Sequence, residues 1–365
     1  MPLSRWPIQK VWAAKGAEYA CDAVALGITI SQISSLLCAL LLYTSTKHQK
    51  PKEKTPGGLR ALLRIALPDA AGSCARSVPL TLEHLLIPVG FRKSGQSAGG
   101  AMTLYGVIHG MALPVILYPA AIMTALASML VPEFAECAAR SNRNRIDSMA
   151  ARAIKITVLF SMGTAAGIMF IFSEGLSQCI YGDGQCAEYL RVLAPLLPIM
   201  YTDTTVDGIL KGLDQQVYSM RYNIIDSAMC VALVLILIPK YSVKGYVAIL
   251  FISEIVNFSL SIHRLSKVCT LEINIMDSII KPAVCVTASF LAGLLLSSAQ
   301  GSGKAALTII ITVNAAVYIL LLMLTGSISA QDIIWFKNIF SRGSKSEKRG
   351  LCAARINDRQ RSLSH

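Results

Sequence analysis

The residues best suited to chemistry in this sequence are ionisable side chains inside long apolar stretches. Asp69, Arg76 and Glu83 lie seven residues apart within the stretch 61–90, a spacing that puts them on one face of a helix, about 10 Å apart per step. A charge at the centre of a bilayer costs at least about 2.5 to 3.5 kcal/mol, so it normally serves a polar cavity or a partner. Arg76 could pair with carboxylates of neighbouring helices, or it could contact an anionic headgroup with Asp69 or Glu83 as a proton or cation site. Both interpretations stay open.

A second group of acidic residues lies in the sequence MYTDTTVDGILKG. Asp203 and Asp207 are four residues apart and share one helical face. Two such carboxylates could share a proton or hold a hard cation with nearby threonine hydroxyls. Because the pair lies near Lys211, in the cytoplasmic half of its stretch, we favour a packing role. Glu254, further along, is deep enough in its apolar stretch to need a partner.

Composition indicates the class of protein that carries these residues. Of the 365 residues, 54% are hydrophobic and 15% are charged, whereas a soluble domain carries about 25% charge. The apolar residues form long blocks, which predicts an all-α, polytopic membrane protein. The net charge of +13 fits a bias of the connecting loops toward anionic lipid, and we expect membrane lipids rather than nucleic acid as partners.

Windows of about 20 residues, the length that spans a bilayer core, predict nine transmembrane helices. We place them at 20–43, 61–90, 101–131, 152–173, 187–211, 222–238, 244–263, 279–299 and 304–325. The second and third are longer than a straight crossing needs and contain prolines, so we expect tilt and kinks there.

The connections between the stretches predict the orientation. Lysine and arginine cluster in alternate connections, in the segments 47–64 and 140–155 above all, and in the tail after Gly326. By the positive-inside rule these parts are cytoplasmic. Nine spans then leave the basic N-terminal residues Arg5, Lys10 and Lys15 outside, so we expect either an unusual first helix or upstream spans that this chain lacks.

No motif for catalysis or for a bound cofactor accompanies these features. The sequence has no GxSxG, HExxH, P-loop or GxGxxG in a suitable context, and its five histidines look scattered. This disfavours an enzyme. Ten cysteines include no CxxC pair. Cys179 and Cys186 share one extracytoplasmic loop, where a disulfide could form in an oxidising exterior, and the sequence leaves open whether they pair.

Several motifs, in order and at the right spacing, resemble stage V sporulation protein B and its relatives, which are oligosaccharide and polysaccharide flippases related to the lipid II flippase and to MATE transporters. The matching pieces are ALP at 66–68, IP with a downstream glycine at 87–95, YG at 105–106, GMALP at 110–114 and LVPE at 130–133. The segment 190–215 resembles the family's tenth helix, and 235–250 resembles the connection between its eleventh and twelfth helices.

The resemblance implies a domain organisation. The segment 1–60 would hold a span similar to the family's sixth helix and a basic linker, and 61–270 the C-terminal six-helix bundle. Two additional spans would occupy 271–325, followed by a basic cytoplasmic tail at 326–365. Full members of that family have two facing six-helix bundles and two extra helices. The resemblance covers only the second bundle and its flanking helices, so we expect a separate N-terminal half as a partner.

The resemblance also implies a mechanism and a location. A lipid-linked sugar, such as a peptidoglycan precursor, would be flipped across the bacterial cell membrane by alternating access, with Arg76 contacting its headgroup. Relatives commonly couple to an ion gradient, Na⁺ or H⁺, through acidic and amide residues, and no other cofactor is expected. The matching region here offers Asp69, Glu83, Asn223, Asp226 and Asn257 as candidates, with Asp203, Asp207 and Glu254 as secondary candidates.

Two alternatives remain at this stage. A MATE-like exporter of organic cations would have an acidic or aromatic cavity and no need for Arg76. A fragment or assembly partner without the N-terminal bundle would be inactive alone. The sugar, the pathway and the coupling ion are left open by the sequence, because one transporter fold serves many substrates.

Overall fold

The computed structural model describes residues 17–46, 58–165, 172–182, 184–271, 276–297, 304–329, 332 and 334–335. Every element of secondary structure in these ranges is a helix, which confirms the predicted fold class. Contacts divide the chain into two units, Met1–Ala71 and Gly72–His365. The predicted domain limits at 60, 270 and 325 stay predictions.

The first unit contains α2 (Ala17–Thr46) and the beginning of α3 (Gly58–Lys93). α2 has 30 residues and is therefore about 45 Å long, more than the hydrocarbon core of a bilayer needs. Its middle part, Leu26–Leu41, is a predominantly apolar helical segment. α3 continues from this unit into the second one as a single helix.

The next predicted span is divided by an irregular turn. α4 (Ala98–Tyr105) is followed by the π-helical turn η2 (Gly106–Ala112) and by α5 (Leu113–Ala139). Pro114 lies in the first turn of α5, where a missing backbone N–H is tolerated. The irregularity expected from the prolines is therefore a widened turn just before Pro114.

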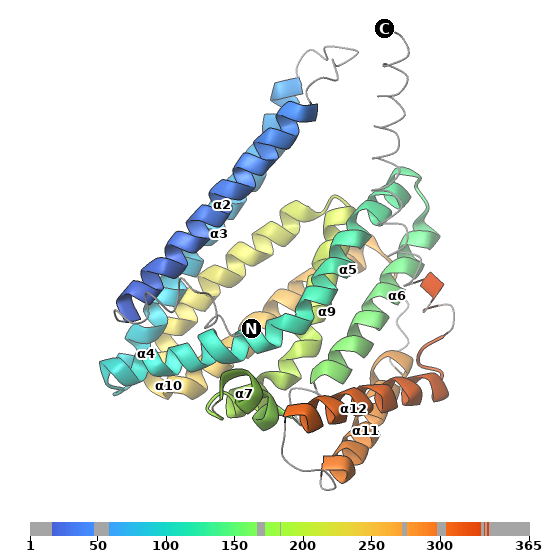
Figure 1. Ribbon diagram of the computed structural model, residues 1–365. Helices are drawn as coiled ribbons and strands as arrows, with labels where there is room; N and C mark the ends of the chain where they lie inside the picture. Colours follow the sequence, from blue (N-terminus) through green and yellow to red (C-terminus); the bar gives the residue numbers. More distant parts are fainter. Residues whose placement is uncertain are drawn as a thin grey trace. The chain divides into compact units, whose positions relative to one another are not determined.

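The helices α5, α6 and α9 enclose the larger part of the core. α6 (Arg143–Met162), α7 (Ser173–Tyr181), α8 (Ala187–Leu193) and the short turn η4 (Ala194–Leu196) lead to α9 (Leu197–Gly212). Figure 1 shows α9 beside α5 and α6, and the buried apolar side chains of these helices form one cluster. Inside it the hydroxyls of Thr157 and Thr205 are 2.9 Å apart and satisfy each other.

Two glycines set the distance between α5 and α9. A methyl group on Gly208 would lie 2.8 Å from Cβ of Ala127, and one on Gly212 would lie 2.7 Å from Cβ of Phe134. Both are well inside the normal carbon–carbon contact distance of about 3.5 to 4.0 Å. The spacing of four residues puts both glycines on one face, so they let the two backbones approach as small residues do in membrane bundles.

The 53-residue helix α10 (Gln216–Val268) is a hairpin of two helical arms. At Ser242 the backbone leaves the helical region, with φ 51° and ψ −126°, and the arms on either side match the predicted spans 222–238 and 244–263. Ser253 on one arm donates a 2.7 Å hydrogen bond to Asp226 on the other. Gly245 is required near the bend, because a side chain there would collide with the carbonyl oxygen of Leu237 at 2.5 Å.

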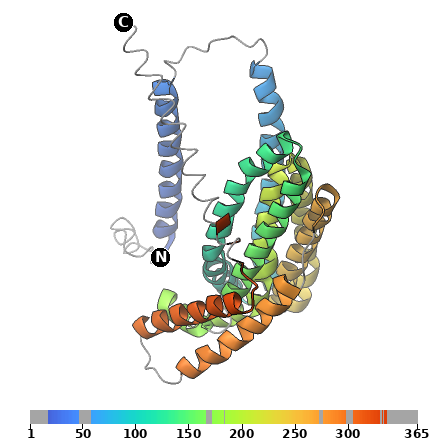
Figure 2. The same cartoon turned by 90° about the vertical axis from the view of Figure 1, so that its right-hand side faces the viewer.

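The last helices are η5 (Met276–Ile280), α11 (Lys281–Ser297) and α12 (Lys304–Leu324). Figure 2 shows α11 and α12 lying against each other, and the amide of Asn314 on α12 exchanges hydrogen bonds with Ser289 on α11. The hydroxyl of Tyr318 donates to the backbone oxygen of Leu159 on α6 at 2.9 Å.

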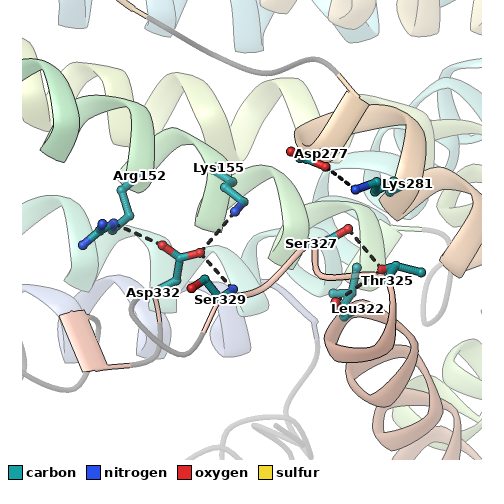
Figure 3. A network of polar contacts seen from close by, with 9 residues as sticks. All are labelled: Arg152, Lys155, Asp277, Lys281, Leu322, Thr325, Ser327, Ser329 and Asp332. Carbon is teal, nitrogen blue, oxygen red and sulfur yellow. Dashed lines mark hydrogen bonds and ion pairs between the residues drawn. The ribbon is translucent and has the colours of Figure 1, made fainter.

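The chain after α12 is held against α6 by charge. Asp332 accepts from Arg152 and Lys155, each at 3.1 Å, and from the backbone N–H of Ser329 at 3.2 Å (Figure 3). The carboxylate is about nine-tenths buried. It therefore offsets part of the charge of two partly buried cations on α6 and ties the segment that leaves α12 to that helix.

Within the part of the chain that the structure describes, two helical segments are long and apolar enough to cross a membrane, Gly99–Ala139 and Gln216–Val268. Shorter apolar helices occupy Leu26–Leu41 and Thr308–Leu324. Cys179 and Cys186 are both free, and the thiol of Cys186 donates to Ser177 at 3.0 Å. The disulfide considered from the sequence is therefore not formed.

Candidate functional site

A polar pocket of about 370 Å³ opens between α5, α9 and α10. Side chains of α5 such as Thr124 and Ser128 form one wall. The other walls carry six acidic or amide residues, Asp203 and Asp207 on α9 and Asn223, Asp226, Glu254 and Asn257 on α10. The structure thus brings most of the predicted coupling residues to one place, although they come from three separate apolar stretches.

The most deeply placed pair in this pocket is Asp203 with Asn257. The amide nitrogen of Asn257 donates to Oδ2 of Asp203 at 2.9 Å. The two residues are 6% and 8% exposed, and Oδ1 of each is buried without a hydrogen-bond partner. An unsatisfied buried acceptor costs about 1 to 3 kcal/mol, more for a charged group. Two such acceptors side by side in an acidic pocket would accommodate a proton or a small cation.

Two other carboxylates of the pocket, those of Asp207 and Asp226, have protein donors. Ser219 donates to Asp207 at 2.7 Å, and Ser253 donates to Asp226 at the same distance. The amide nitrogen of Asn223 is turned back to the carbonyl oxygen of Ser219 on its own helix. Asp207 thus joins α9 to α10, while Asp203 keeps one buried oxygen without a donor.

The charge around the pocket is unbalanced. Four carboxylates and one basic residue, Lys211, are among the residues that line it. Like charges at this range repel each other strongly when water is scarce. The arrangement favours a positive species in the pocket, and an anionic headgroup would be repelled from it.

The predicted face of α3 is only partly described. The side chains of Asp69 and Arg76 lie outside the described residues. Glu83 is half-buried and interacts electrostatically with Asp226 and Tyr105. The assignment of Asp69, Arg76 and Glu83 to a substrate cavity therefore stays a prediction.

A ring cluster that the sequence analysis missed lies close to Glu83. The histidines that look scattered in the sequence meet here, because the rings of His84 and His109 have centroids 4.6 Å apart. Tyr105 is stacked on His109, with centroids 5.1 Å apart and an angle of 9° between the planes. The sequence feature that could have indicated this cluster is an ionisable histidine in each of two neighbouring apolar stretches, His84 in 61–90 and His109 in 101–131.

The described residues give no indication of a multidentate metal centre. Within these ranges no group of three or more histidine, cysteine, aspartate or glutamate side chains is placed to hold a metal ion.

No protein-family model matches the chain, but it is homologous to stage V sporulation protein B of Bacillus subtilis (strain 168). The two are 21% identical over 329 residues, which cover 87% of this chain and 63% of that protein. Sporulation protein YkvU of the same organism is 24% identical over 136 residues, covering 37% of this chain and 30% of that protein. The chain thus spans less than two thirds of the length of these relatives.

Among solved structures, the chain resembles lipid II flippase MurJ in its inward closed conformation. The TM-score is 0.56 at 16% identity, over 86% of this chain and 65% of that one. This similarity shows the fold. The chain is a polytopic helical membrane protein, as the apolar stretches predict.

Proposed function

We propose that the chain belongs to a transporter that flips a lipid-linked oligosaccharide or peptidoglycan precursor across the bacterial cell membrane by alternating access. The observation that carries the proposal is the common fold with lipid II flippase MurJ over 86% of the chain, supported by homology to stage V sporulation protein B. The positive-inside rule supports a cytoplasmic C-terminus.

The proposed headgroup contact is Arg76 on α3. Its spacing of seven residues from Asp69 and from Glu83 gives one helix face a cation between two carboxylates. A guanidinium binds pyrophosphate oxygens in a forked geometry that a lysine does not match. The acidic pocket between α5, α9 and α10 would repel the same headgroup, so the two sites have different ligands.

The proposed coupling site is the pair Asp203 and Asn257. Their two unpartnered Oδ1 atoms and the excess of carboxylates favour H⁺ or Na⁺ there. Glu83 does not line this pocket. In alternating access, a cation bound by α9 and α10 would stabilise one arrangement of these helices over the other.

A complementary N-terminal bundle is the proposed partner. Substrate in this fold passes between two halves, and the chain spans 63% of stage V sporulation protein B. We therefore expect full activity when both halves are present.

A second candidate is a MATE-like exporter of organic cations, which the acidic pocket favours. This pocket lies within one bundle, between α5, α9 and α10, and its volume of about 370 Å³ is at the lower end for small-molecule sites. Both features suit an ion better than an organic substrate.

Rescue of a cell depleted of its lipid II flippase tests the proposal. We expect growth when the chain is expressed with a complementary N-terminal bundle, and loss of growth with Arg76→Ala. The control is Arg92→Ala in the last turn of the same helix, which should rescue like the unchanged chain. Resistance to cationic dyes without rescue would support the exporter instead.

A further inference from the structure

The ring cluster next to Glu83 is a site of its own. His84 lies on α3, whereas Tyr105 ends α4 and His109 lies in the π-helical turn η2. The hydroxyl oxygen of Tyr105 is 3.2 Å from Nδ1 of His84. Nδ1 of His109 is buried without a hydrogen-bond partner. Three polar rings from two helices thus converge, with one ring nitrogen unused.

Two of these rings are stacked across the start of the π-helical turn. Tyr105 directly precedes η2 and His109 lies within it. The planes of the two rings lie within 9° of parallel. A π turn has poorer hydrogen-bond geometry than an α turn and is frequent at functional sites. The side chains of His84, Tyr105 and His109 are each partly exposed.

The cluster can hold a proton without losing its hydrogen bond. A tyrosine hydroxyl donates to a neutral imidazole nitrogen and accepts from a protonated one. The contact between Tyr105 and His84 therefore persists in either state of His84. The second ring limits the charge, because two imidazolium ions with centroids 4.6 Å apart would repel each other.

The surroundings balance one positive charge. Glu83 on α3 and Tyr246 on α10 interact electrostatically with Tyr105 of the cluster. The other titratable groups on the elements packed around it are Asp226 and Cys230 on α10, Tyr189 on α8 and Tyr181 on α7. In this set, the groups that are charged at neutral pH are the carboxylates of Glu83 and Asp226. An added proton on the histidine pair is thus compensated, whereas a second one is opposed by the first.

We propose that His84, Tyr105 and His109 form a binding site for a single proton, shared by the two imidazoles and balanced by Glu83. Histidine is the side chain that changes charge between about pH 5 and 8. Uptake of the proton places a positive charge between α3 and η2, where the two imidazole rings meet. The site does not depend on the proposed flippase activity.

Nuclear magnetic resonance of histidine-labelled full-length chain in detergent micelles tests the site directly. Imidazole nitrogen shifts give the protonated fraction of each ring, and single substitutions assign them. We expect the fractions of His84 and His109 to add up to one proton at about pH 5. In His109→Gln we expect His84 to become fully protonated alone, and in His84→Gln the same for His109.

The controls separate a shared proton from two ordinary histidines. His263, which is exposed near the end of α10, should titrate identically in every variant. Tyr105→Phe should change the titration of His84 and leave His263 unchanged. The proposal is overturned if both rings become fully protonated independently, or if neither takes up a proton above about pH 5. A flipping assay that fails while the shared titration holds would refute the proposed function alone.

Discussion

Gly208 offers a sharp test of how α9 packs on α5. In Gly208→Ala the new methyl carbon would lie 2.8 Å from Cβ and 3.0 Å from both Cα and the carbonyl oxygen of Ala127. The neighbouring atoms belong largely to the backbone, so the helices must separate by several tenths of an ångström. Overpacking of this kind costs about 1 to 3 kcal/mol, which exceeds the gain of up to about 1 kcal/mol from alanine in a helix.

Gly99→Ala is the matched control, since no atom lies within 4 Å of a methyl group there. Thermal unfolding followed by helical circular dichroism in detergent measures both variants. We expect a lower melting temperature for Gly208→Ala, and an unchanged or slightly higher one for Gly99→Ala. If Gly208→Ala melts at or above the unchanged protein, the close approach of α5 and α9 is wrong.

Three other substitutions test single contacts. Asp332→Asn leaves Arg152 and Lys155 without their carboxylate, so we expect a loss of about 1 to 3 kcal/mol and faster proteolysis of the segment after α12. Asn257→Leu removes the donor to Asp203 and should lower the melting temperature at neutral pH, with a smaller loss in acid, where a protonated Asp203 no longer needs a donor. Gly245→Ala should disrupt the bend of α10, because its methyl group would meet a carbonyl oxygen at 2.5 Å; an unchanged melting temperature would contradict the hairpin.

The helical plan could be predicted from the sequence because each apolar block must be about 20 residues long to cross a bilayer. Each of the nine predicted stretches overlaps helices in the part of the chain that the structure describes, and the break between 238 and 244 contains Ser242, where the backbone bends. The π-helical turn was not predictable from hydropathy, because it leaves the apolar pattern almost unchanged.

The partners of the site residues could not be predicted in the same way. Periodicity shows which residues share a helix face, as for Asp203 and Asp207, but it does not show which other helix that face meets. The contact of Asp203 with Asn257 spans 54 positions and depends on tertiary packing. The meeting of His84 with His109 likewise depends on how α3 lies against η2.

The most direct test of the proposed transport uses liposomes that carry a polyprenyl pyrophosphate lipid with a fluorescent label on its sugar. An external membrane-impermeant reductant bleaches the outer leaflet, and flipping brings further label to it. With the chain and a complementary N-terminal bundle reconstituted together, we predict bleaching beyond the outer-leaflet fraction, reduced by Arg76→Ala and unchanged by Arg92→Ala. Bleaching that stops at the outer-leaflet fraction with both halves present would contradict the account.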